Sequence, residues 1–122
     1  MNEDEVLDFA RTALASVWSL ELLLLLHRAP DEAWQDADLI VPLRANARVV
    51  AESLAALCGK GLVTADEAGR YRYRPASATL GQAVDALAEL YSRKPMTVTN
   101  AILSGRNDKI RTFADAFRFR TH

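Results

Sequence analysis

The chain has 122 residues, of which half are hydrophobic and a quarter are charged, so its composition is that of a globular domain and excludes a disordered chain. Its one cysteine, Cys58, excludes an internal disulfide framework and fits a reducing compartment, for which we expect the cytoplasm.

The net charge of −1 gives the whole chain no general attraction to nucleic acid, but the charge is divided unevenly. Residues 1–40 carry nine acidic and two basic side chains, whereas residues 41–122 carry seven acidic and thirteen basic side chains. This asymmetry indicates a nucleic-acid face or a contact between chains, with chance clustering on a solvated surface as the alternative.

The first predicted helix runs from about Asp4 to Ala15 and begins with acidic residues, which suit a helix N-terminus. A second helix, capped by Ser16 or Ser19, contains the apolar run Leu22–Leu26 and ends before Pro30. We expect this helix at the centre of the fold and not in a membrane, because about 20 apolar residues are needed to cross a bilayer. The acidic start of the chain is also unlike a signal peptide.

A very short strand at Ala33-Trp34 is expected next, followed by a helix that starts near Asp36. Pro42 lies late in that helix and predicts that it is short or kinked. Asn46 is a good cap for the following helix, which Gly59 or Gly61 closes. Its predicted inward positions share a helical spacing: Val49, Val50, Leu54 and Leu57.

The strongest β signal lies between residues 62 and 74. Leu62-Val63-Thr64 is β-prone, Asp66-Glu67-Ala68-Gly69 has turn composition, and Arg70–Arg74 alternates arginine with tyrosine. This pattern predicts a hairpin whose second strand directs its tyrosines to one side and its arginines to the other, and which Pro75 ends.

The remainder of the chain reads as helical, with a helix over Thr79–Arg93, a break at Pro95, and a short helix around Val98–Leu103. A last helix is expected after Asn107, with Ile110, Phe113, Ala114 and Phe117 on one face. We therefore divide the chain into residues 1–78, a winged helix-turn-helix domain with an N-terminal helix, and residues 79–122, a helical extension that packs on the same core or forms a dimer seam.

The predicted fold class is mainly α with a small β-hairpin, a winged helix-turn-helix with additional C-terminal helices. The apolar spacing across residues 38–63 is similar to that of small bacterial winged-helix regulators of the MarR-like kind, and the resemblance covers about residues 17–75. It implies a sequence-specific, DNA-binding transcriptional regulator that is usually a homodimer.

The expected DNA-binding residues lie on the recognition helix, at the turn before it and on the wing. On the helix, only Arg48 is a strong reader of base edges; Glu52 accepts a hydrogen bond from cytosine but repels phosphate. The wing arginines are expected on phosphates or in the minor groove. The full predicted set is Arg44, Asn46, Ala47, Arg48, Ala51, Glu52, Arg70, Arg72 and Arg74.

The alternative function is a winged-helix module that binds another regulator or the transcription machinery without reading DNA, which the alanine-rich recognition face and near-neutral charge favour. A ligand sensor with a pocket between the leucine helix and the C-terminal helices is a third possibility. His27, His122 and Cys58 form no catalytic or metal-binding pattern with other residues, so we expect no enzyme activity, no cofactor and no metal.

Overall fold

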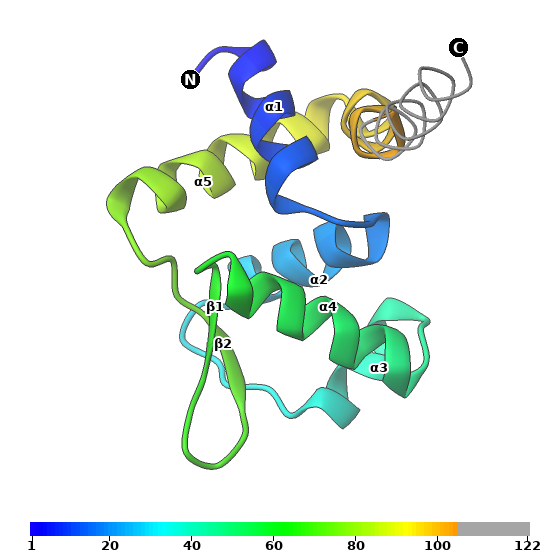
Figure 1. Ribbon diagram of the computed structural model, residues 1–122, viewed down its shortest axis with the longest axis vertical. Helices are drawn as coiled ribbons and strands as arrows, with labels where there is room; N and C mark the ends of the chain where they lie inside the picture. The colour runs from blue at the N-terminus through cyan, green and yellow to red at the C-terminus, as the bar shows by residue number, and fades with distance from the viewer. Residues whose placement is uncertain (105–122) are drawn as a thin grey trace, which may run out of the picture.

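The computed structural model describes residues 1–104 and consists mainly of helices with one small antiparallel sheet (Figure 1). The coarse fold class predicted from the sequence is therefore confirmed. In chain order the elements are α1 (Glu3–Ala13), α2 (Val17–Arg28), the 3₁₀ helix η1 (Asp36–Leu39), α3 (Ile40–Leu43), α4 (Ala47–Gly59), β1 (Val63–Ala65), β2 (Tyr71–Tyr73) and α5 (Ala78–Arg93), after which residues 95–104 are helical.

Four helices begin at a polar side chain that accepts a hydrogen bond from the backbone N–H three residues later, which satisfies one of the free donors at a helix start. In α2 the cap is Ser16, not Ser19; in α4 it is Asn46, as predicted. The four caps are Asn2, Ser16, Asn46 and Ser77.

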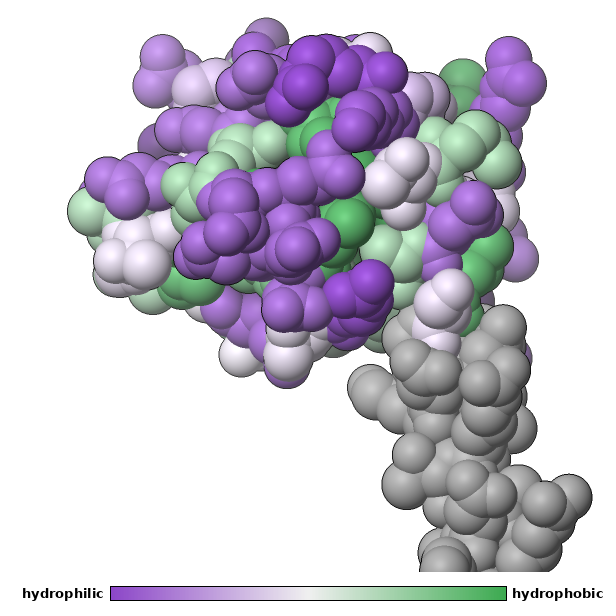
Figure 2. Space-filling model, turned by 90° about the horizontal axis from the view of Figure 1, so that it is seen from above, coloured by the Kyte–Doolittle hydropathy of each residue, from purple (hydrophilic) through white to green (hydrophobic). Residues whose placement is uncertain are grey.

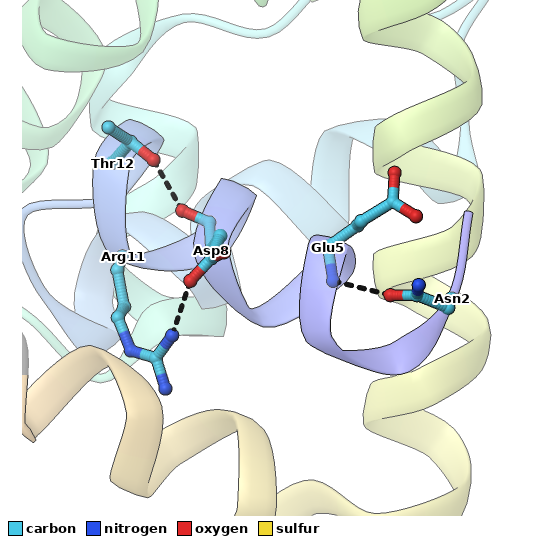
Figure 3. Close-up of polar contacts among 5 residues, drawn as sticks. All are labelled: Asn2, Glu5, Asp8, Arg11 and Thr12. Atoms are coloured by element: carbon cyan, nitrogen blue, oxygen red, sulfur yellow. Dashed lines mark hydrogen bonds and ion pairs between the residues drawn. The ribbon is translucent and has the colours of Figure 1, made fainter.

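Helix α1 spans Glu3–Ala13, so the predicted end at Ala15 is wrong. The side chain of Asn2 accepts from the N–H of Glu5 at 2.9 Å, and Arg11 pairs with Asp8 at 2.7 Å one turn away (Figure 3). Leu14 turns into extended backbone and is buried, which allows the chain to reverse direction into α2.

Helix α2 lies at the centre of the molecule, as the leucine run predicted (Figure 1). It packs against α4, and α1 packs against α5. The outer side formed by α1 and α5 is mostly hydrophilic, with small hydrophobic areas between the polar side chains (Figure 2). Four leucines of α2 have no exposed surface: Leu20, Leu22, Leu23 and Leu26.

The segment that contains Pro42 is a 3₁₀ turn, η1, followed by the single α-helical turn α3, in agreement with the prediction of a short or kinked helix. Proline has no N–H to donate, so it is tolerated in a first helical turn and not in a longer ladder. Leu39 and Leu43 point from this segment into the core.

Strands β1 and β2 form a hairpin in which Thr64 lies opposite Arg72 and Val63 opposite Tyr73. The turn is held by Asp66, whose side chain accepts from the N–H groups of Ala68 and Arg70, both at 2.9 Å. The short strand expected at Ala33-Trp34 is one bridge, in which Trp34 and Tyr71 exchange backbone hydrogen bonds of 2.8 and 2.7 Å.

Gly61 connects α4 to the hairpin in a left-handed conformation, with φ +74. Its N–H donates to the carbonyl of Cys58, and the N–H of Leu62 donates to the carbonyl of Leu57, which are the two bonds of a Schellman helix end. Leu57 and Leu62 are both fully buried, so this turn fixes where the hairpin leaves the core.

The helical residues after α5 begin at Pro95, three residues before the predicted start at Val98, because proline suits the first position of a helix. Val98, Ala101 and Ile102 join the same buried cluster as α1, α2 and α5. The helix expected after Asn107 lies outside the described residues, and the division of the chain at residue 78 stays a prediction.

Gly61→Ala should destabilise the chain by about 1–2 kcal/mol, because a side chain is strained at positive φ. Its Cβ would also lie 3.2 Å from the Cβ of Ala76. Gly59→Ala is the matched control: a Cβ there meets nothing within 4 Å, and the change should stabilise the helical end by about 0.5–1 kcal/mol. Urea unfolding measures both, and equal effects of the two substitutions would contradict this role of Gly61.

Candidate nucleic-acid interface

Helix α4 has two faces with different roles. Val50, Leu54 and Leu57 are buried toward α2, whereas Val49 is only half-buried, so its predicted inward position is partly wrong. The opposite face is open to solvent and carries only one pair of charged side chains among alanines. Its exposed residues are Ala47, Arg48, Ala51, Glu52 and Ala55.

Arg48 and Glu52 form an ion pair on this face, with 3.0 Å between Nε and Oε1. Their side chains remain 86% and 64% exposed, so the pair stands clear of the protein surface. Pairs this exposed contribute at most about 0.5 kcal/mol to stability. Either partner can therefore exchange the other for an external ligand at small cost.

The turn between α3 and α4 places two of the predicted residues at the start of α4. Arg44 is exposed and left-handed, at φ 52 and ψ 41, and is the one non-glycine residue with positive φ in residues 1–104. The side chain of Asn46 accepts from the N–H of Val49 at 2.9 Å. Asn46 thus acts as a cap, and its amide nitrogen remains for an outside acceptor.

The structure shows only part of the predicted separation of tyrosines and arginines on the hairpin. Tyr71 and Tyr73 are half-buried and pack against the core. Arg72, between them, is half-buried as well, whereas Arg70 and Arg74, just before and after β2, are exposed. Within residues 1–104 neither these three arginines nor Arg44 form an ion pair with a carboxylate.

A contact behind the hairpin involves His27, which the sequence placed in no catalytic or metal-binding pattern. His27 Nε2 lies 2.8 Å from Asp85 Oδ1 on α5, and its ring meets the ring of Tyr73 edge-on at 5.1 Å. The three residues come from α2, β2 and α5. Because His27 and Asp85 are 58 positions apart in the chain, no local spacing in the sequence could have indicated their contact. They hold the second strand of the hairpin against both helices.

The hydroxyl of Tyr73 is buried and has no hydrogen-bond partner within residues 1–104. Burial, with a smaller effect of the negative charge of Asp85, raises the pKa of Tyr73 to about 12. The hydroxyl therefore stays neutral, and the ring serves as packing surface under the hairpin.

A cavity of about 360 Å³ opens between α2, α3 and α5, beside His27. Its volume is that of a small-molecule site. Its lining is mainly apolar, and the polar residues Glu21, Arg28 and Ser92 in it form no set of converging polar groups. The remaining lining residues are mainly apolar: Leu24, Leu25, Pro42, Leu43, Ala88 and Tyr91.

The described residues give little support for a reactive thiol, a metal site or a membrane span. Burial raises the pKa of the Cys58 thiol, which disfavours the reactive thiolate form. Residues 1–104 contain no group of three or more histidine, cysteine, aspartate or glutamate side chains placed to hold a metal. Over the same residues no single helix is long and apolar enough to cross a membrane. Helices α1 and α2 together have that length and apolarity, but the pair is bent by 109° between them.

Comparisons of this chain with protein-family models, with curated proteins and with solved structures found no match.

Tyr73→Phe should remove an alkaline loss of stability. In the unfolded chain the hydroxyl ionises near its ordinary pKa of 10.0, whereas in the folded chain it stays neutral to about 12. The folded state binds more protons in this interval, so its stability is full below pH 10.0 and falls as pH rises toward about 12.

Urea unfolding of the parent chain, Tyr73→Phe and the control Tyr71→Phe across that interval checks this. The parent and the Tyr71 variant should lose stability relative to Tyr73→Phe, and three identical pH profiles would contradict the buried hydroxyl.

Proposed function

We propose that this chain is a winged helix-turn-helix transcriptional regulator that binds double-stranded DNA, with α4 as the recognition helix and the β1–β2 hairpin as the wing. The order of elements supports this: α2, the bridge at Trp34, the short η1–α3 segment, α4 and then the hairpin. In such a domain the second helix of the helix-turn-helix lies in the major groove. The resemblance to MarR-like regulators belongs to the same proposal.

The observation that carries the proposal is the row of arginines on the hairpin. Arg70, Arg72 and Arg74 alternate with tyrosines that face the core, and no carboxylate in residues 1–104 pairs with them. A guanidinium group without an internal partner suits phosphate, which it binds with short, charge-assisted hydrogen bonds. The hairpin leaves from one end of α4, and α3, whose C-cap is Arg44, lies near the other end (Figure 1).

The segments before and after α4 thus carry arginines, and the exposed face of α4 itself presents alanines and the Arg48–Glu52 pair. Phosphate contacts fix the register of a protein on DNA, and a helix with short side chains comes close to the base edges. We propose a division of labour in which the hairpin and Arg44 supply affinity and α4 supplies sequence preference.

We also propose a homodimer, since helix-turn-helix proteins pair to match two half-sites about one helical turn apart. Met96 and Leu103, on the last described helical residues, are 66% and 47% exposed and offer apolar surface for a second copy. A DNA-binding role implies a cytoplasmic location in a bacterial cell.

A protein-binding module is the second candidate, because the pairing of Arg48 with Glu52 leaves the exposed face of α4 neutral. A neutral face of alanines packs well against another protein. In this function the partner packs on the α4 face, so the hairpin arginines are dispensable for partner binding. In the DNA-binding function the hairpin arginines are required for binding DNA.

Replacing Arg70, Arg72 and Arg74 together by alanine should abolish the retardation of duplex DNA and lower the salt dependence of binding. Each lost phosphate contact reduces the slope of log K against log salt by about 0.9, so the slope should fall by about 2.7 per chain. The control is Arg11→Ala with Arg93→Ala and Lys94→Ala, which removes the same charge from α1 and the end of α5. If both triple variants bind DNA like the parent, the wing proposal is wrong.

Arg44→Gly should separate folding from binding. Glycine adopts the left-handed conformation of residue 44 without strain, so the variant should be as stable as the parent or more stable by up to about 1 kcal/mol. DNA binding should nevertheless weaken severalfold, because a phosphate contact is lost. Thermal unfolding and DNA titration of the same preparation measure both, and unchanged DNA affinity would remove Arg44 from the interface.

A further inference from the structure

The ion pair on α4 differs from the other ion pairs within helices in residues 1–104 in the order of its charges. In α1 the acid, Asp8, precedes the base, Arg11, and in α5 Glu89 precedes Arg93. In α4 the base comes first: Arg48 precedes Glu52 by four residues. Arg48 also lies in the first turn of its helix, which contains no acidic residue.

This order opposes the stability of the helix. The N-terminal end of a helix carries partial positive charge, which favours acids and disfavours bases there. An acid four residues before a base also stabilises a helix more than the reverse order does. The chain follows both rules in α1 and the second rule in α5, and breaks both in α4, at the most exposed pair of the three.

The atoms that the pair leaves unused form a base-reading edge. Arg48 donates to Glu52 through Nε, and within residues 1–104 its Nη1 and Nη2 atoms donate no hydrogen bond. Glu52 accepts through Oε1, so Oε2 retains its lone pairs. The contact thus engages Nε of Arg48 and leaves its two terminal amino groups without a partner within residues 1–104.

Two bases match these free atoms in the major groove. Guanine presents two adjacent acceptors, O6 and N7, that fit a pair of guanidinium N–H groups, and cytosine presents an amino group at N4 that needs an acceptor. The flanking side chains, Ala47, Ala51 and Ala55, are exposed and short, so they let α4 approach these atoms closely.

We propose that Arg48 and Glu52 act as one specificity unit for two neighbouring G·C base pairs, with Nη1 and Nη2 of Arg48 donating to O6 and N7 of a guanine and Oε2 of Glu52 accepting from N4 of a cytosine. The inference rests on the proposed DNA-binding function and gives it a sequence preference. Glu52 has two tasks in this unit: it positions Arg48, and it rejects bases that lack an amino donor.

The unit also explains why a carboxylate is tolerated on a DNA-facing helix. Glu52 repels phosphate, and Arg48 cancels that charge. The helix therefore adds little general affinity for DNA, and the energy it contributes depends on the bases it meets. A wrong base leaves a charged group without its partner in the groove.

Selection of bound sequences from a pool of randomised duplex DNA tests the inference, with the parent chain, Glu52→Gln, Arg48→Lys and the control Arg93→Lys, which alters the α5 pair in the same way. The parent and the control should enrich a site with two neighbouring G·C pairs, preferring them by about tenfold or more over other pairs. Glu52→Gln should lose the preference at the cytosine and bind random duplex more tightly. Arg48→Lys keeps the charge but loses the planar fork, so it should lose the preference at both positions.

Three results overturn the inference in distinguishable ways. If the variants enrich the same site as the parent, or if the parent binds duplex DNA without enriching G·C pairs, the specificity unit is wrong and DNA binding stands. If the parent binds no duplex DNA, both the specificity unit and the proposed DNA-binding function are wrong. Circular dichroism of each variant confirms that a lost preference does not come from a lost fold.

Discussion

The structure depends on the burial of α2. Four of its leucines have no exposed surface, and α4 packs directly against it. Because α4 must bury Val50, Leu54 and Leu57 in this contact, its opposite side faces solvent with alanines and one ion pair. Truncation of one such leucine to alanine typically costs 2–5 kcal/mol, a large share of the stability of a chain of this size.

The hairpin is joined to this core in three ways. The Schellman turn at Gly61 sets the direction in which β1 leaves α4, and the Trp34 bridge holds β2 from its other edge. The ring of Tyr73 lies against His27, which in turn meets Asp85 on α5. Arg72 therefore lies on a strand that is held against α2 and α5, and Arg70 and Arg74 lie directly beside it, so little backbone entropy is lost when they bind phosphate.

The elements that depend on neighbouring residues were predictable from the sequence. Asn46 as a cap, the short helix around Pro42 and the β1–β2 hairpin all follow from local rules of backbone and side-chain geometry. The end of α1 was predicted two residues too late, since the burial of Leu14 decides where the chain turns.

Local rules do not predict contacts between distant parts of the chain or the hydrogen-bond partner of an exposed side chain. The meeting of His27 with Asp85 and Tyr73 depends on how α2, α5 and β2 pack. Arg48 and Glu52 were expected to contact bases separately, whereas in the structure Glu52 accepts a hydrogen bond from Nε of Arg48. Two residues that seemed to have opposing effects on DNA binding thus form one unit.

The central claim is that DNA contacts the exposed face of α4 and the arginine side of the hairpin. A titration of the isotope-labelled chain with duplex DNA, followed by nuclear magnetic resonance of the backbone amides, tests it most directly. The account predicts that signals from residues 44–55 and 64–74 shift together, and that those of α1 and the outer side of α5 stay in place. Shifts confined to α1 and α5, or no shifts at any DNA concentration, would contradict it.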